Sequence, residues 1–435
     1  MTYNRTIDPH AGATKRPSRL VEWRLLLLTG LYALVGAAAL YWGSGDALEP
    51  RVLYACLLSV GAYFLVSFYW YLVRYRGDCF ILPAVALLTT TSLVFLFRLD
   101  PEYGMRQFIW LLIALVVLLL TTRLFTDFRF LSDYKYIYAL AGLIALLMPV
   151  FFGTEQGGAK SWLDLGAFYV QPSEFVKILV VLFMASYLSE NRMLLGAGAG
   201  LKGRFSLPGL QEWGPLLVMW GISLLLLVFQ RDLGAALIYF STFLTMLYVA
   251  TSRFSYVLLG LLMFAAGVAA SYQIFNHVQI RVSTWLNPWA TIDAGGYQIT
   301  QSLFAINAGG LVGSGLGLGF PLSIPAVHTD LIFAAISEEM GLAGGVCLLT
   351  LYLIIVFLGI RTALCTRDEF AALAACGLTS LLGLQVFIII AGVTKFLPLT
   401  GITLPFISYG GSSLVANFIL LGLLLNISHE GRTSP

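Results

Sequence analysis

Apolar residues gather into long, uninterrupted segments along this chain of 435 residues. A helix needs about 20 apolar residues to cross the hydrocarbon core of a bilayer, and most of the segments reach or approach that length. The pattern therefore predicts an all-α polytopic membrane bundle. Twelve spans are expected, near residues 24–42, 52–73, 80–97, 107–124, 136–152, 172–188, 214–229, 233–250, 254–272, 331–360, 370–394 and 403–427.

The distribution of Lys and Arg orients these spans, because both residues accumulate in cytoplasmic loops. With the N-terminus in the cytoplasm, most of the 25 Lys and Arg fall on the inner side, and both chain ends lie there. An even number of spans fits this alternation. The count depends on segments 214–229 and 233–250, which form either a tight hairpin or one broken element. The Lys and Arg outside the inner group are Arg51, Arg98, Arg106, Lys160, Lys177, Arg231, Arg281 and Lys395.

This topology divides the chain into four parts. Residues 1–23 form a basic cytoplasmic tail, residues 24–98 hold extra and leading N-terminal spans, and residues 428–435 form a cytoplasmic C-terminal tail. No clear small-residue cleavage site follows the first apolar segment, which favours an uncleaved first span. The membrane core occupies residues 107–427.

Composition supports a membrane protein. Hydrophobic residues make up 59% of the chain and charged residues only 11%, whereas soluble domains carry about 25% charged residues. A water-soluble enzyme does not fit these values, and the 14% aromatic content does not fit disorder. The net charge of +3 is small and scattered, which argues against a nucleic-acid partner.

Two outward loops, 153–171 and 273–330, are too long to be simple connectors. Long loops in compact proteins are usually functional or disordered, and these are too apolar for disorder. The second loop still carries an apolar stretch around residues 299–320. We expect part of it to lie in the interface or to re-enter the membrane.

Glu174 and Lys177 are the sharpest anomaly in the apolar pattern. They lie three residues apart at the outer end of the sixth span, and this spacing puts them on one helix face. Ionisable residues inside a span are functional candidates by default. One interpretation is a cation that faces an outward cavity, with Glu174 holding Lys177 in place. The other is a structural ion pair between helices.

Further acids lie near the membrane boundary. Asp330 stands where the long outer loop meets the tenth span, so it is either a general base with a raised pKa or a helix N-cap. Glu338 and Glu339, one to two turns further, either shape a cation site or bond to polar groups of the bundle. Asp232 either caps a helix or pairs with Arg231.

Two segments break the regular helical pattern. The glycine-rich segment 309–319 contains no G-x-G-x-x-G and has no βαβ context. It favours close helix contact or a re-entrant turn, with a backbone nest for a lipid-linked diphosphate as the alternative. Segment 398–413 combines prolines, glycines and serines, and predicts a broken helix end whose Ser408 and Ser412 either pack or line a polar groove.

Together these motifs resemble those of the shape, elongation, division and sporulation (SEDS) family, the RodA/FtsW/SpoVE-type membrane proteins of bacterial cell-wall synthesis. They occur in family order over roughly residues 107–427. The matching residues are Gly158-Ala159-Lys160-Ser161-Trp162, Gln171-Pro172-Ser173-Glu174 with Lys177, Asp232-Leu233-Gly234, Gly296-Tyr297-Gln298 with Gln301-Ser302, His328-Thr329-Asp330 and Pro405-Phe406-Ile407-Ser408-Tyr409-Gly410-Gly411-Ser412-Ser413.

The resemblance implies a ten-span core, here with two further N-terminal spans, that polymerises lipid II on the outer face and releases undecaprenyl diphosphate. It implies that Asp330 is the essential carboxylate, that Glu174 and Lys177 form a polar pair in a central cavity, and that a class B penicillin-binding protein is the partner. One departure is Ala326, which stands where the family usually has Glu.

The implied reaction needs a base for the acceptor hydroxyl and cations for the departing diphosphate. Asp330 is the candidate base, and Lys177 is among the candidate cations. A divalent cation, Mg²⁺ or Mn²⁺, is a further candidate, with Glu174 or Asp330 as ligands. The expected substrate-binding residues are Lys160, Trp162, Gln171, Arg281, Gln298, His328, Thr329, Lys395, Ser408 and Ser412.

The leading hypothesis is therefore a peptidoglycan glycosyltransferase of the bacterial cytoplasmic membrane that acts in cell elongation or division. A flippase for the lipid-linked precursor is the alternative, because a twelve-span bundle with a buried Glu–Lys pair also suits alternating access. A third reading is a scaffold without catalytic activity that activates a penicillin-binding protein.

Overall fold

The computed structural model describes residues 19–43, 51–125, 128–156, 159–164, 166, 168–197, 218, 221–225, 227–292 and 295–433. Within these residues, eleven helices are long and apolar enough to cross a membrane. They are α1 (Arg19–Gly43), α2 (Arg51–Leu72), α3 (Ile81–Leu99), α4 (Pro101–Leu124), α6 (Lys135–Phe152), α7 (Pro172–Ala197), α9 (Leu233–Thr251), α10 (Phe254–Ile274), α13 (Ile332–Cys365), α14 (Glu369–Val393) and α15 (Gly411–Thr433).

Each of these helices matches one predicted span, which confirms the polytopic helical fold. The twelfth expected span, 214–229, lies partly outside the described residues, and the positions described there, 218, 221–225 and 227–229, are helical. Gly157, Gly158, the first 18 residues and residues 434–435 also lie outside the described part of the chain.

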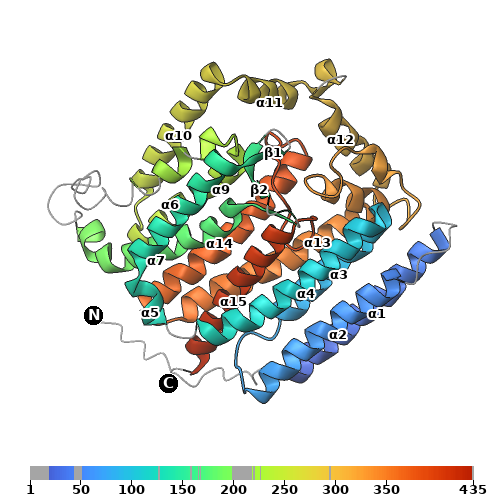
Figure 1. Cartoon of the computed structure of the whole chain (residues 1–435), viewed down its shortest axis with the longest axis horizontal. Coiled ribbons are helices and arrows are strands. Elements are labelled where there is room, and N and C mark those ends of the chain that lie inside the picture. Colours follow the sequence, from blue (N-terminus) through green and yellow to red (C-terminus); the bar gives the residue numbers. More distant parts are fainter. Residues whose placement is uncertain are drawn as a thin grey trace, which may run out of the picture.

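The most deeply buried of these spans are α3, α7 and α15, in which most residues are buried inside the molecule. Phe95, Phe183 and Phe418, one on each of these helices, are almost completely buried. By contrast, α10 exposes nearly its whole surface, as expected for a helix in contact with lipid. Helices α1 and α2 form a hairpin at one edge, packed on α3 and α4 (Figure 1).

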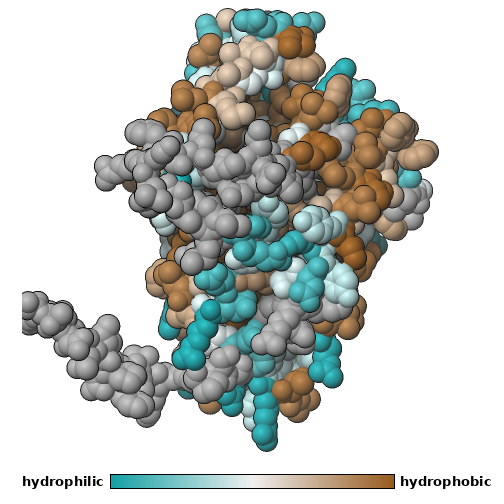
Figure 2. Space-filling view, turned by 90° about the vertical axis from the view of Figure 1, so that its left-hand side faces the viewer, coloured by the Kyte–Doolittle hydropathy of each residue, from teal (hydrophilic) through white to brown (hydrophobic). Residues whose placement is uncertain are grey.

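Apolar residues cover much of the flank of the molecule in Figure 2, whereas hydrophilic residues gather toward its lower end. An exposed apolar flank is destabilising in water and suits a protein whose solvent is lipid. The surface therefore agrees with the apolar segments of the sequence.

The first long loop, 153–171, contains a small antiparallel sheet that the sequence analysis did not predict. Its strands are β1 (Thr154–Gln156), β2 (Ala159–Asp164) and β3 (Tyr169–Val170), in the order β1-β2-β3. Strands of two to six residues leave too short an alternation to detect in a sequence. The sheet brings β2 and β3 over the start of α7.

The second long loop, 273–330, forms an arch of short helices between α10 and α13 (Figure 1). Its two α-helices, of 11 and 13 residues, are too short to be among the eleven spans. The elements are α11 (Asn276–Leu286), the 3₁₀ helix η1 (Pro288–Thr291), α12 (Tyr297–Gly309) and the 3₁₀ helix η2 (Pro321–Ser323); the short α5 (Phe128–Asp133) lies elsewhere, before α6.

Helix α13 is broken at Gly341, whose φ is 66° and ψ is −170°. A break inside a membrane leaves backbone N–H and C=O groups that need partners. The glycine-rich segment 309–319 supplies them and makes close backbone contact, since a Cβ at Gly313 would lie 2.2 Å from the Glu339 carbonyl oxygen. The Leu342 and Ala343 N–H groups donate to the carbonyl oxygens of Gly310 and Leu311. In the other direction, the Ser314 and Gly315 N–H groups donate to the carbonyl oxygens of Glu338 and Glu339. All four distances are 2.9 to 3.1 Å.

The acids before this break also bind the glycine-rich segment. Glu339 forms an ion pair with Arg98 at 3.3 Å and accepts a hydrogen bond from the Gly317 N–H at 3.0 Å. Glu338 accepts one from the Phe320 N–H at 2.8 Å. The structure therefore supports the helix-contact interpretation of segment 309–319, whose backbone groups serve α13.

The last span begins later than the sequence pattern predicts. Helix α15 starts at Gly411, not near residue 403, and residues 397–410 form an irregular loop. Pro398 and Pro405 remove backbone donors, and Phe406 has a φ of 66°. The apolar run is thus continuous although the helix is not, and the loop lies beside the start of α13.

Candidate active site

A cavity of about 1420 Å³ opens at the end of the bundle where α4, α7, α13 and α15 begin. Strands β2 and β3, helices α11 and α12, and the loops before α13 and α15 complete its wall. Typical small-molecule pockets measure about 300–1,000 Å³, so this cavity has room for more than one small ligand. It gathers nine predicted site residues: Trp162, Gln171, Glu174, Arg281, Gln298, His328, Thr329, Asp330 and Ser412.

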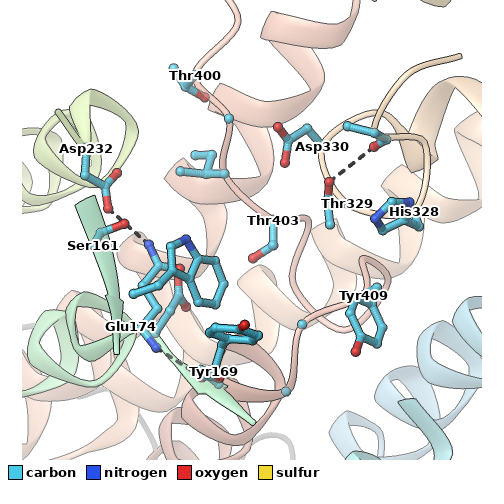
Figure 3. Close-up of a pocket in the computed structure, with 18 of the residues that line it drawn as sticks. Ser161, Tyr169, Glu174, Asp232, His328, Thr329, Asp330, Thr400, Thr403 and Tyr409 are labelled. Carbon is cyan, nitrogen blue, oxygen red and sulfur yellow. Dashed lines mark hydrogen bonds between the residues drawn. The ribbon is translucent and has the colours of Figure 1, made fainter. Parts of the chain in front are cut away.

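Figure 3 shows how these residues face one another. Asp232 and Glu174 lie on one side of the cavity, and Asp330 lies across from them with Thr329 and His328. Residues of the loop before α15 stand between the two sides. The acids of the site thus belong to different elements that converge only in the folded chain.

Asp330 occupies a loop that is fastened to the segment before α15. The Tyr409 N–H donates to the His328 carbonyl oxygen at 2.8 Å, and Ser408 Oγ donates to the Thr329 carbonyl oxygen at 2.5 Å. The N-cap of α13 is Leu331, so the structure does not support the N-cap interpretation of Asp330. The carboxyl is left at the cavity wall.

Ser408 is the first correction to the predicted set of cavity residues. Its buried hydroxyl accepts a hydrogen bond from the Leu404 N–H at 2.8 Å while it donates to Thr329. Both partners are backbone groups of the two loops beside the cavity. Ser408 therefore positions the Asp330 loop behind the wall, instead of lining the cavity.

The pKa of Asp330 is raised to about 6, chiefly because burial removes water from the carboxyl. A hydrogen bond with Thr329 and the positive charge of Arg281 act in the opposite direction. A carboxylate with a pKa near the working pH is well suited to accept a proton and release it again.

Arg281 of α11 connects the arch to the loop before α15. Its guanidinium donates to the carbonyl oxygens of Leu399 at 3.3 Å and Thr400 at 3.0 Å. A Cβ at Gly401, where φ is +74°, would lie 3.6 Å from Asp330 Oδ2 and 3.8 Å from Arg281 Nη2. The carboxyl and the guanidinium thus flank one glycine.

Glu174 and Lys177 form the predicted pair, with 2.6 Å between Lys177 Nζ and Glu174 Oε2. The structure reverses their expected arrangement, because Glu174 lines the cavity and Lys177 lies beneath it. Lys177 also donates to Gln385 Oε1 at 2.9 Å, and Gln385 Nε2 donates to the Thr403 carbonyl oxygen. The lysine therefore ties α7 to α14 and orients Glu174.

Asp232 is a cavity residue whose importance the sequence left open. It caps α9 by accepting a hydrogen bond from the Ala235 N–H at 3.0 Å, and it accepts another from Gln171 Nε2 at 3.1 Å. Burial raises the pKa of Asp232, and the charge of Glu174 raises it further. The capping alternative is confirmed, while Arg231 pairs with Glu155 instead.

The predicted phosphate-binding lysines are placed away from the cavity wall. Lys160 Nζ donates to the Val150 carbonyl oxygen at the end of α6. Lys395 has a φ of 63°, and its carbonyl oxygen accepts a hydrogen bond from Trp285 Nε1. The cations that do line the cavity are Arg106, Arg231 and Arg281.

Sequence reasoning also missed aromatic residues of the wall, including Tyr103, Trp110, Phe168 and Tyr409. Aromatic residues are common at both membrane interfaces, so their position near the end of a span carried no specific signal. Only the folded arrangement shows that three separate segments, α4, the loop before β3 and the loop before α15, bring them to one cavity.

The acids of the cavity do not form a complete metal cage. Among the described residues there is no group of three or more His, Cys, Asp and Glu side chains that could hold a metal ion. Mg²⁺, however, is commonly held by one or two carboxylates together with substrate phosphates. The carboxylates of Glu174, Asp232 and Asp330 therefore fit an ion that is held together with a diphosphate.

Comparisons with known proteins identify a matching family and several similar relatives. A family model described as "Cell cycle protein" (FtsW/RodA/SpoVE) matches residues 72–433. Peptidoglycan glycosyltransferase RodA of Mycobacterium tuberculosis is 46% identical over 369 residues, which cover 82% of this chain and 78% of that protein. Stage V sporulation protein E of Bacillus subtilis is 36% identical, covering 67% and 76%.

Two solved structures show the same fold. A chain from a peptidoglycan synthase complex, studied for the coordination of polymerization and crosslinking, superposes with a TM-score of 0.69 at 27% identity and covers 82% of this chain and 99% of its own. Rod shape determining protein RodA of Thermus thermophilus gives a TM-score of 0.58 at 26% identity, covering 83% and 99%.

Proposed function

Because the chain belongs to the cell cycle protein family of FtsW, RodA and SpoVE, we propose that its cavity polymerises lipid II into glycan strands at the outer face of the cytoplasmic membrane. The chain is a peptidoglycan glycosyltransferase, as its relatives are. The observation that carries the proposed mechanism is the position of Asp330 on the wall of a large cavity, with Arg281 on the other side of Gly401. Burial, which raises the pKa of Asp330 to about 6, supports it.

The proposed step is the attack of an acceptor sugar hydroxyl on the anomeric carbon of a donor. Asp330 takes the hydroxyl proton as the new carbon–oxygen bond forms. The bond between the anomeric carbon and the phosphate oxygen breaks, and its electron pair leaves with undecaprenyl diphosphate. Asp330 then releases its proton to water, which returns the carboxylate to its starting state.

Arg281 and Arg231 supply positive charge at the same cavity. Fixed cations stabilise the negative charge that develops on a leaving diphosphate without reorganising during the reaction. Arg281 is already held by the carbonyls of Leu399 and Thr400, so its position is set before the substrate binds. Glu174, held by Lys177, is proposed to hydrogen-bond substrate hydroxyl or amide groups.

A divalent cation, Mg²⁺ or Mn²⁺, is proposed to accompany the diphosphate, with Glu174 or Asp330 as ligands. It would add positive charge at the leaving group. The roles of Asp330 as base and of Arg281 as a fixed cation do not depend on it.

The cellular setting is proposed on the same basis. Both chain ends lie in the cytoplasm, a class B penicillin-binding protein crosslinks the product, and the pair acts in elongation or division. A single cysteine at the exposed Ser323, in a chain whose five native cysteines are replaced, should react with an impermeant reagent in intact cells. Reaction only after permeabilisation would overturn this orientation.

The test of the reaction uses the purified chain with its penicillin-binding partner in detergent, where transport has no meaning. Incubation with lipid II should give glycan polymer on a gel. Asp330→Asn should give none, whereas Glu190→Gln, which alters an exposed acid far from the cavity, should behave as wild type. No polymer from the folded complex would favour the flippase or scaffold, and equal polymer from Asp330→Asn would remove Asp330 from the mechanism.

A further inference from the structure

The wall of the cavity has two chemically different sides, which we call the charged wall and the aromatic wall. The charged wall comprises Gln171, Glu174, Arg231, Asp232 and Arg281. It is contributed by α7, α11 and the turn before α9. The aromatic wall comprises Tyr103, Trp110, Phe168, His328 and Tyr409.

The aromatic wall consists of two sets of ring contacts, and α4 contributes one ring to each. Tyr103 stacks on His328 with 4.4 Å between ring centroids and 12° between the planes. Tyr409 lies 4.8 Å from Tyr103 and 6.2 Å from His328. Trp110 contacts Phe168 edge to face at 5.6 Å. These contacts join α4, the loop before α13, the loop before α15 and the loop before β3.

The aromatic wall presents mainly rings to the cavity; Arg106, between Tyr103 and Trp110 on α4, is the charge beside them, and it pairs with Glu102. Burial lowers the pKa of His328, so its imidazole is neutral at neutral pH. Ligand sites usually combine apolar and aromatic walls with a few polar groups that fix orientation. The apolar C–H faces of a pyranose ring fit such a surface, whereas a diphosphate does not.

Asp330 lies at the boundary between the two walls. It follows His328 of the aromatic wall by two residues, and it faces Arg281 of the charged wall across Gly401. A general base must be within hydrogen-bond reach of the proton that it removes, which belongs to the acceptor. The leaving diphosphate belongs to the donor and needs the cations.

These positions assign a side of the cavity to each substrate. We propose that the aromatic wall is the acceptor subsite, where Tyr103, His328 and Tyr409 bind pyranose rings of the acceptor glycan and present its terminal hydroxyl to Asp330. The donor diphosphate occupies the charged wall. The inference rests on the proposed function and deepens it by separating the two saccharide sites.

A single-coupling reaction tests this assignment. The donor is lipid II whose terminal sugar is the C4 epimer, N-acetylgalactosamine, so that it donates but does not accept. The acceptor is a lipid-free tetrasaccharide of the glycan strand, which has no diphosphate and only accepts. Coupling lengthens the tetrasaccharide by one disaccharide, and the KM of each substrate is measured separately.

Tyr103→Ala should raise the KM of the acceptor about tenfold, the size expected for loss of one aromatic contact, and leave the KM of the donor unchanged. Tyr103→Phe keeps the ring and should restore the wild-type value. Tyr54→Ala, at an exposed tyrosine of α2, is the matched control. If Tyr103→Ala does not fold, Tyr103→Leu removes the ring while keeping an apolar side chain.

The outcomes separate this inference from its premise. No glycan polymer from unmodified lipid II by the folded wild-type complex would overturn the proposed function itself. Polymer from lipid II without any coupling to the tetrasaccharide would overturn only the assignment of a lipid-free acceptor subsite. Coupling with an unchanged acceptor KM in Tyr103→Ala, or with a raised donor KM, would overturn only the assignment of the aromatic wall. If Tyr103 merely holds the Asp330 loop, kcat falls while the acceptor KM stays constant, and that result would also overturn it.

Discussion

Two groups of acidic side chains lie at or within the spans of this chain, and they differ in their surroundings. Glu339 pairs with Arg98 and accepts a hydrogen bond from the Gly317 N–H, and Glu338 accepts one from the Phe320 N–H. Asp330 and Asp232 line a cavity of about 1420 Å³ together with Glu174. The first group completes a broken helix, whereas the second faces a space that a substrate can enter.

The difference shows that an acid in an apolar segment is not by itself a sign of catalysis. Burying a charge is costly unless partners satisfy it, and the chain meets this cost in two ways. Glu339 pairs with Arg98 and accepts a hydrogen bond from the Gly317 N–H, so its partners belong to the protein itself. Asp330 is left with a raised pKa beside a cavity, so its chemistry is completed by a ligand.

The largest expected effect is that of Asp330→Asn. General base catalysis contributes about 10²–10⁴-fold to a rate, and Asn has a similar shape but cannot accept the proton. Polymerisation should therefore fall by about three orders of magnitude while the unfolding temperature in detergent does not decrease. The matched change Glu338→Gln should keep activity, and a comparable loss of rate there would erase the distinction between the two groups.

The next effect concerns stability instead of rate. Glu339→Gln leaves Arg98, which is 19% exposed, without its carboxylate. Hydrogen bonds to charged groups contribute about 1.5–3 kcal/mol, so the free energy of unfolding should fall by ~2 kcal/mol. Thermal unfolding in detergent measures this loss, and the activity per folded molecule should stay at the wild-type value. Lost activity with unchanged stability would place Glu339 with the cavity acids.

How far the sequence predicts this distinction depends on the residue. The spans follow from apolar length alone, and the pairing of Glu174 with Lys177 follows from their three-residue spacing. The direction in which Lys177 points does not, because it is set by Gln385 of another helix. Similarly, the start of α15 at Gly411 depends on a loop whose composition is as apolar as a span.

The cavity could not be predicted from a local sequence pattern, because its residues come from distant parts of the chain. Asp330 and Asp232 are separated by nearly a hundred residues, and the arch that carries Arg281 brings its charge near both. The resemblance to a family indicated Asp330 as a site residue. Arg106, Tyr103 and Tyr409 could be recognised as cavity residues only from the folded structure. Convergence of distant segments, not residue type, distinguishes the two groups of acids.

The pH dependence of the reaction sharpens the comparison further. Asp330 accepts a proton only when ionised, and its pKa is about 6, so kcat/KM should be constant at higher pH and fall about tenfold per pH unit below pH 6. Arg281 lowers this pKa, and Arg281→Gln should move the acid limb to higher pH. Glu339→Gln should leave the profile where it is. A rate that stays constant down to pH 5 would contradict the role of Asp330.

The smallest expected effect comes from the hydroxyl that fastens the Asp330 loop. Ser408→Ala removes the bond to the Thr329 carbonyl oxygen and leaves the buried Leu404 N–H without its acceptor, a loss of about 1–3 kcal/mol in general. Because Ser408 lies behind the wall, kcat should fall by roughly fivefold with little change in KM. Ser59→Ala, which removes a buried hydroxyl bonded within α2, controls for lost packing. A raised KM with normal kcat in Ser408→Ala would mean that Ser408 contacts the substrate directly, and the boundary of the cavity would then have to include it.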